Sequence, residues 1–404
     1  MRGPQPSDAL RLLCDCAAWA WAPGRSTEIR ARAERIGDWH AFVTFTVRHR
    51  LQGFANDALA AAGAALPPSA AAALGSAAKD VARANLLALQ ETKRLTQAFT
   101  AARIDVLDLK GLPLAILVYG ECMRRHGKDI DLLVQPADFP RAAALIESLG
   151  YARKIPGADV SGPVFALWMR NRKDVSYRKD GQEIELHWRL ANNPLLLEWP
   201  WRPANWQTVD IGYGIRVRTA ARGDLFAYLC AHGAMGAWYR LKWVADVAGL
   251  LARESADGIA QLYAHAERLG VERPAGQVLL LCEDLFDTAL PANLAKRLHA
   301  DPIVRFLARM AIGRLNGAEI AAPNTAAFDT LWAAPARLLL RKGLRYKLKE
   351  IAISLADPEP LTHMPIAEKV IFLYPILRPL VWFGAQLRRR GRRTQVAEER
   401  TRRG

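Results

Sequence analysis

The sequence predicts an α+β fold, with a small α/β core held between helical N- and C-terminal regions. Two apolar runs of strand length, residues 104–109 and 129–134, flank an interval with helical spacing. Asp180-Gly181 separates two further strand-like segments and is typical of a β-hairpin turn. The chain is therefore divided into a helical N-terminal region (1–100), an α/β core (101–220) and a helical C-terminal domain with a basic tail (221–404).

Composition predicts a globular protein of a reducing compartment. The chain has 404 residues, of which 51% are apolar, so it can fill sizeable cores. Its five cysteines are an odd number without framework spacing, which favours free thiols and argues against a zinc site. The N-terminus interrupts its apolar residues with Asp8 and Asp15 and does not resemble a signal peptide. We therefore expect a cytoplasmic location.

The charge of +16 suits an anionic partner such as a nucleotide, a nucleic acid or an acidic lipid. Residues 388–403 contribute eight arginines and two glutamates, and such tails are most often simply solvated. Residues 370–387 are apolar but interrupted by Pro375, Arg378 and Pro379, which favours a packed helix or a membrane-surface segment over a spanning helix. Peripheral contact with the inner membrane or a protein through the tail is the resulting alternative. A specific nucleic-acid partner is not predicted, because the basic residues lack interleaved aromatics.

In the N-terminal region, helical spacing extends over residues 8–62, with a break at Pro23-Gly24. Pro67-Pro68-Ser69 ends one helix and can start another, with Ser69 as the cap. Residues 79–102 then have the pattern of one long amphipathic helix that leads into the first strand.

The core elements follow in order from the first strand. Lys110-Gly111 forms a turn after residues 104–109, and Pro113 lies in the first turn of a helix over 112–119. The second strand is 129–134, and a helix over 142–149 ends at Gly150. Residues 174–178 and 182–188 are expected to pair as a hairpin, and helices continue from Asp224.

Asp129 and Asp131 are the main functional clue, because two carboxylates open a strand that is otherwise apolar. Side chains alternate along a strand, so the two carboxylates share a face about 7 Å apart and need compensation. In phosphoryl transfer, divalent cations bound by such oxygen ligands compensate this negative charge. The simpler alternative is an exposed strand start whose acidic residues face water.

Further residues favour the metal interpretation. The turn at Lys110-Gly111 opens a helix whose free N–H groups can receive phosphate oxygens, and Arg124, Arg125 and Lys128 add positive charge. A third carboxylate is available from the later strand, as Glu183 or Glu185. His187 shares their face and is a second-tier candidate for a base or a stacking platform, although packing is the commoner role.

The run Leu109-Lys110-Gly111-Leu112-Pro113-Leu114-Ala115, with Tyr119, Arg124 and Asp129-Ile130-Asp131-Leu132-Leu133-Val134, resembles the poorly characterised bacterial nucleotidyltransferase family of the DNA polymerase β-like superfamily. Glu185-Leu186-His187-Trp188 is similar to a later strand motif of that family, and residues 238–246 are similar to its helical motif. With His49-Arg50 included, the resemblance extends to about Leu251.

This resemblance implies a polymerase β-like nucleotidyltransferase mixed sheet in which Asp129, Asp131 and Glu185 are the catalytic and metal-binding residues. Two Mg²⁺ ions, or Mn²⁺ in their place, are the implied cofactors. Lys110, Gly111, Arg124 and Lys128 are the expected nucleotide-binding residues. The implied reaction moves a nucleoside monophosphate from ATP or another nucleoside triphosphate to an unidentified hydroxyl acceptor on a small molecule, a sugar or a protein, with release of pyrophosphate.

One departure from the superfamily concerns the turn. Gly-Ser is usual after the first strand, whereas this chain has Lys110-Gly111-Leu112, without the serine that would touch the triphosphate. Either Lys110 substitutes for this serine, or the nucleotide binds differently. The alternative from a different class is a catalytically weak binding protein that keeps the fold and acts at a membrane surface or on a protein partner. The sequence leaves the acceptor, the base preference and the oligomeric state open.

Overall fold

A computed structural model describes residues 5–127, 129–198, 201–317, 335–362, 373–374 and 376–378 of the chain. Three features discussed above therefore lie outside the described residues: Lys128, the arginine-rich tail, and most of the apolar segment 370–387.

The described helices are α1 (Asp8–Ala18), α2 (Ser26–Ala33), α3 (Trp39–His49), α4 (Gln52–Ala61), α5 (Pro68–Ala101), α6 (Leu112–Tyr119), α7 (Phe139–Ser148), α8 (Gly162–Asn171), α9 (Arg222–Met235), α10 (Leu241–Leu251), α11 (Ala256–Arg268), α12 (Glu272–Phe286), α13 (Ala292–Ala300), α14 (Pro302–Asn316) and α16 (Leu344–Leu355). Within the part of the chain that the structure describes, no helix combines the length and the apolar character that a bilayer crossing requires.

The strands are β1 (Val106–Asp108), β2 (Ile130–Val134), β3 (Ala152–Ile155), β4 (Asp174–Lys179), β5 (Gln182–His187), β6 (Trp206–Asp210) and β7 (Arg216–Ala220). The first five form one mixed sheet in the order β1-β2-β5-β4-β3, and β6 and β7 form a separate hairpin. Only the β2–β5 pair is parallel within the five-stranded sheet. The α+β prediction with a mixed sheet between helical regions is confirmed.

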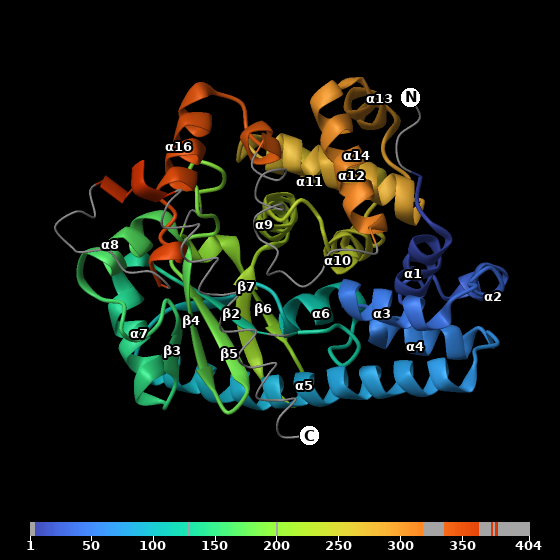
Figure 1. Cartoon of the computed structure of the whole chain (residues 1–404), viewed down its shortest axis with the longest axis horizontal. Helices are drawn as coiled ribbons and strands as arrows, with labels where there is room; N and C mark the ends of the chain where they lie inside the picture. Colours follow the sequence, from blue (N-terminus) through green and yellow to red (C-terminus); the bar gives the residue numbers. More distant parts are fainter. Residues whose placement is uncertain are drawn as a thin grey trace.

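The two faces of this sheet are covered differently. Ile130, Leu132, Ile184 and Leu186 face a core completed by residues of α5 and α7. On the opposite face Leu107, Leu109 and Leu133 join the large core formed by the N-terminal helices and α9 to α14. Figure 1 shows α5 running the length of the molecule below both the sheet and the N-terminal helices. Asp131 shares the face of Leu133, so this carboxylate of β2 lies on the side of the sheet that faces the helical regions.

The principal differences from the sequence-based expectation are in the regular elements. Helix α5 is continuous from Pro68 to Ala101, because Pro68 lies in its first turn, where a missing N–H leaves no bond unmade; the proline pair therefore begins one long helix, and Ser69 is not its cap. The strand β3 and the hairpin β6–β7 are not predicted from the sequence. The burial of β3 shows why, since its ends are exposed and it has no apolar alternation.

Candidate active site

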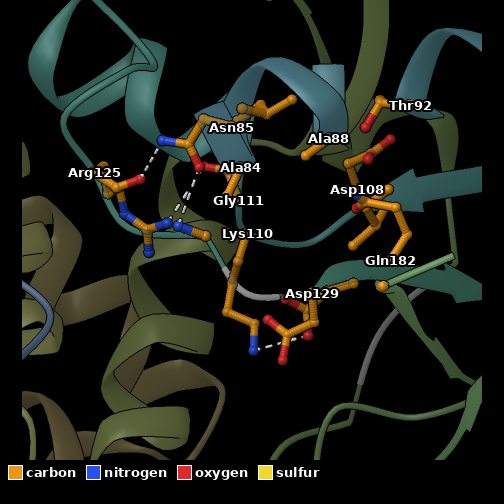
Figure 2. Close-up of a pocket in the computed structure, with 15 residues that line it drawn as sticks. Ala84, Asn85, Ala88, Thr92, Asp108, Lys110, Gly111, Arg125, Asp129 and Gln182 are labelled. Atoms are coloured by element: carbon orange, nitrogen blue, oxygen red, sulfur yellow. Dashed lines mark hydrogen bonds and ion pairs between the residues drawn. The ribbon is translucent and has the colours of Figure 1, made fainter. Parts of the chain in front are cut away.

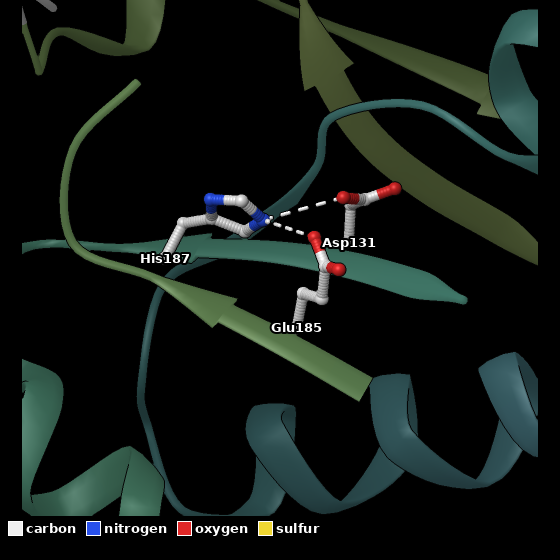
Figure 3. A group of neighbouring side chains, drawn as sticks. All are labelled: Asp131, Glu185 and His187. Carbon is white, nitrogen blue, oxygen red and sulfur yellow. Dashed lines mark hydrogen bonds and ion pairs between the residues drawn. The ribbon is translucent and has the colours of Figure 1, made fainter. Parts of the chain in front are cut away.

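The parallel pairing of β2 with β5 creates the site. Asp131 lies opposite Glu185, and Leu133 lies opposite His187. Residues two apart on a strand share a face, so Asp131, Glu185 and His187 project to the same side of the sheet. Figure 3 shows the three side chains converging there from the two strands. The structure therefore brings together two of the three predicted carboxylates and the second-tier histidine.

The two distances from His187 to the carboxylates suit three ligands of one ion. His187 Nε2 lies 3.2 Å from Asp131 Oδ1 and 3.5 Å from Glu185 Oε2, and one ligand atom from each residue falls within 4.8 Å of the others. Ligands that each lie about 2.0–2.2 Å from one cation are separated by roughly 3–3.5 Å. The donor set of two carboxylates and an imidazole fits a divalent ion, and manganese accepts the nitrogen more readily than magnesium does.

Asp129 completes the acidic cluster from the residue just before β2. Burial raises the pKa of Asp129, and the negative charges of Asp131 and Glu185 raise it further. The shift means that Asp129 carries its charge at a cost in this environment. A divalent cation near these carboxylates would relieve that cost.

Lys110 and His187 both contact the same carboxylate oxygen of Asp131. Lys110 Nζ is 2.9 Å from Asp131 Oδ1, and both side chains are largely buried. Burial lowers the pKa of Lys110, but its negatively charged neighbours, Asp131 first and then Glu185 and Asp129 among them, together outweigh burial and leave that pKa well above its usual value. Conversely, burial raises the pKa of Asp131, but Lys110 and His187 bring it well below its usual value. Lys110 is therefore a fixed cation beside the carboxylates.

The turn that follows Lys110 depends on glycine. Gly111 has φ +69° and ψ −128° and directly precedes the first turn of α6, which also contains Pro113. Side chains disfavour this backbone conformation, so only glycine adopts it without strain. An added Cβ would lie 4.0 Å from the carbonyl oxygen of Asp129, so space is not the constraint there. The turn brings the N-terminus of α6 beside the acidic cluster, as expected from the sequence.

The two arginines of the loop between α6 and β2, Arg124 and Arg125, have different partners. Arg124 pairs with Asp57 at 2.5 Å and lies over the ring of Trp19, so the structure does not bring it to the carboxylates. Arg125 is buried, and its guanidinium donates two hydrogen bonds of 2.8 Å to the carboxylate of Asp246. Arg125 also lies 3.4 Å from the carbonyl oxygen of Gly111. Arg125, and not the predicted Arg124, is therefore the arginine close to the Gly111 turn.

A single side chain of α5 fixes this loop. Asn85 Nδ2 donates to the carbonyl oxygens of Cys122, Met123 and Arg125 at 2.8, 3.2 and 2.8 Å. Its Oδ1 accepts a hydrogen bond of 3.3 Å from the backbone N–H of Gly127. Because a buried asparagine that satisfies several backbone groups defines one loop conformation, α5 sets the path of the chain into Asp129.

A pocket opens between α5, the Gly111 turn and the start of β2, with about 610 Å³ of space, part of it open to solvent. Figure 2 shows Asn85, Ala88 and Thr92 of α5 on one side and Lys110 with Asp129 on the other. Lys110, Gly111, Asp129 and Asp131 of the predicted set line this pocket, whereas Arg124 and Glu185 do not.

Glu183 and Glu185 have different surroundings. Glu183 is buried and paired with Arg178 of the adjacent strand β4 and with Lys154 of β3. The Glu185 side chain keeps 29% of its surface exposed and lies opposite Asp131. The geometry therefore favours Glu185 as the third carboxylate.

Sequence reasoning misses several groups behind the cluster. Lys173 and Asp174 approach Nδ1 of His187 at 3.4 and 3.7 Å, and Asp108 is buried at the wall of the pocket. Burial raises the pKa of Asp108 to about 7, with a further contribution from Asp131. A charged residue as the last residue of a buried strand is the one signal that could have identified Asp108.

A mixed sheet in which a glycine turn and a helix follow the first strand, and in which the two adjacent parallel strands carry carboxylates, is typical of the nucleotidyltransferase class of folds. Residues 37–287 match the family described as "Uncharacterised nucleotidyltransferase", and the chain belongs to this family. The resemblance inferred from the sequence is thereby confirmed. Comparison with curated proteins and with solved structures finds no match.

Proposed function

We propose that the chain transfers a nucleoside monophosphate from a nucleoside triphosphate to a hydroxyl acceptor, with pyrophosphate as the leaving group. The observation that carries this proposal is the convergence of Asp129, Asp131 and Glu185 beside Lys110 and the N-terminus of α6. Membership of a nucleotidyltransferase family supports the class of reaction.

The triphosphate would bind at the turn. The first N–H groups of α6 lie beside the pocket, and such groups, together with the positive end of the helix dipole, favour phosphate oxygens. Lys110 reaches the same place and remains protonated because of its carboxylate neighbours. It would supply the contact that the absent serine makes in the wider superfamily, and it would offset charge on the phosphates.

Asp131 and Glu185 would hold Mg²⁺ or Mn²⁺, with His187 as an additional nitrogen donor. Asp129, whose charge interacts with both carboxylates, would add a third carboxylate. When bound, such ions neutralise phosphate charge and lower the pKa of an attacking hydroxyl. The Glu185 side chain is 29% exposed, against 2% for Asp131, so Glu185 rather than Asp131 is the carboxylate placed to accept a proton from an arriving acceptor. The acceptor is a small molecule, a sugar or a protein with a free hydroxyl.

The test uses the purified full chain with Mg²⁺ or Mn²⁺ and each of the four triphosphates labelled at the α-phosphate. Small-molecule extract and the protein itself serve as acceptor pools. We expect metal-dependent pyrophosphate release and label transfer that Asp129→Asn and Asp131→Asn abolish. Asp105→Asn is a matched control, because Asp105 is exposed and pairs with Arg218 outside the site. Absence of both pyrophosphate release and metal-dependent nucleotide binding contradicts the proposal.

A further inference from the structure

Helix α16 has one face anchored to the protein. Tyr346, Glu350 and Ile353 are buried, at the spacing of one helix face. Tyr346 donates a hydrogen bond of 2.7 Å to the carbonyl oxygen of Arg337, and Glu350 accepts one of 3.0 Å from Asn193. The orientation of α16 on the protein is therefore fixed.

The opposite face is apolar and exposed. Leu344, Leu348, Ile351 and Leu355 are 69, 57, 44 and 47% exposed. Their spacing of four, three and four residues places them in one stripe along the helix. Scattered exposed leucines are common, but a continuous apolar stripe indicates an interaction surface. Figure 1 shows α16 at the periphery of the molecule, on the far side of the sheet from α5.

Cations flank this stripe. Arg345, Lys347 and Lys349 lie to either side of it, and none forms an ion pair with another residue that the structure describes. The single carboxylate of α16, Glu350, is on the buried face, where it lies 3.2 Å from Arg337. The exposed side of α16 thus combines apolar and positive groups without an acidic residue.

A basic pocket adjoins the N-terminal end of the stripe. It has about 900 Å³ of space, part of it open to solvent, and its lining includes Arg268, Arg341, Lys342 and Arg345. Glu198 is the one carboxylate in that lining. Arg341 donates to the carbonyl oxygens of Leu195 and Leu196, and Lys342 lies 3.5 Å from Glu272. Arg345 is left to face the pocket without an ion-pair partner among the described residues.

We propose that the exposed face of α16 and this basic pocket form a docking surface for an anionic lipid bilayer, here called the α16 membrane face. An apolar stripe flanked by lysine and arginine is the pattern of a helix that lies in a membrane interface. The stripe would enter the acyl boundary, while the pocket would receive phosphate head groups.

The test is flotation of the full chain with two kinds of vesicle, one of phosphatidylcholine alone and one that also contains phosphatidylglycerol. We expect binding to the second kind only, weakened by salt. The triple variant Leu344→Ser, Leu348→Ser, Ile351→Ser should bind at least about tenfold more weakly. Replacing Arg268 and Arg345 with glutamine should weaken binding about fivefold for each cation.

The matched control is Leu86→Ser, Leu87→Ser, because these leucines are 44 and 47% exposed on α5. It should bind as the wild type does, and all variants should keep the wild-type melting temperature, since the substituted apolar side chains are exposed.

Three results overturn the proposal. The first is wild-type protein that binds neither kind of vesicle, or binds both equally. The second is stripe variants that bind like the wild type, while a full-length chain with glutamines in place of the arginines of residues 388–403 does not bind. The third is a dimer in solution that the stripe substitutions dissociate, which would make this surface a subunit interface.

Discussion

Nζ of Lys110 lies 2.9 Å from Oδ1 of Asp131, and Nε2 of His187 lies 3.2 Å from the same oxygen. One carboxylate therefore carries two cationic or hydrogen-bonding partners, while Asp129 beside it has a raised pKa. Because the pKa of Asp129 is raised and that of Asp131 is lowered, substitutions of the two aspartates should affect stability differently.

Lys110→Gln should lower kcat/KM by about 100-fold, mainly through a higher KM for the triphosphate, because a fixed charge at the phosphates is lost. Stability should fall by about 3 kcal/mol, since a buried carboxylate loses a charged partner. Steady-state kinetics and urea unfolding measure the two effects. Lys79→Gln, at an exposed position of α5, is the control and should leave both unchanged.

Asp129→Asn and Asp131→Asn should both reduce activity on the order of 1,000-fold but shift stability in opposite directions. Removing the charge of Asp129 relieves burial and repulsion, so the variant should gain about 1 kcal/mol. Removing the charge of Asp131 leaves Lys110 and His187 without their negative partner, so the free energy of unfolding should fall by about 3 kcal/mol. Thermal unfolding without added metal would contradict this account if both variants moved in the same direction.

Asp108 gives the stability a defined pH dependence. Its pKa is raised to about 7 in the folded chain, above the value of about 3.9 in an unfolded one. A raised carboxyl pKa contributes stability that is present below about pH 4 and is lost as the pH rises through 7. Asp108→Asn should therefore become more stable than the wild type across this range, by on the order of 2–4 kcal/mol at pH 8. Urea unfolding of both proteins from pH 4 to 8 measures this. A difference in unfolding free energy that stays constant over that range would refute the prediction.

His187 should set the preference among divalent ions. The wild type is expected to show a larger rise in melting temperature with Mn²⁺ than with Mg²⁺, because an imidazole ligand suits manganese better. His187→Gln should weaken Mn²⁺ binding about tenfold and Mg²⁺ binding less. Calorimetric titration of each ion reads this out without any turnover. Equal losses for both ions would assign His187 a packing role.

Arg125 and Asp246 should be strongly coupled. Both side chains are buried, and Asp246 also accepts a hydrogen bond of 3.0 Å from Tyr119. Either Arg125→Gln or Asp246→Asn should cost about 3–5 kcal/mol, whereas the double variant should cost much less than the sum. A double-mutant cycle by urea unfolding measures the coupling. Additive costs would show that the pair contributes little beyond its separate contacts.

Local patterns predicted most of the core. The helix 112–119 matches α6 residue for residue, and the Asp180-Gly181 turn does join β4 to β5, with both residues at positive φ. Each of these rests on short-range chemistry. The pairing that sets Asp131 beside Glu185 joins segments more than 50 residues apart. The residues alone offer Glu183 or Glu185 as the partner, and the family resemblance selects Glu185. The difference between Arg124 and Arg125 depends on Asp57 and Asp246, which no local pattern places.

The path of α5 also bears on how the chain can be divided. Its 34 residues end at Ala101, and by helix geometry they extend about 51 Å. Ala84, Asn85, Ala88 and Thr92 form one wall of the pocket, so a fragment of residues 101–220 would lack both that wall and the side chain that organises the loop before Asp129. A fragment that contains all the strands of the sheet is therefore not sufficient to form the pocket. The smallest fragment able to bind a nucleotide should begin upstream of Pro68, so that it includes the whole of α5.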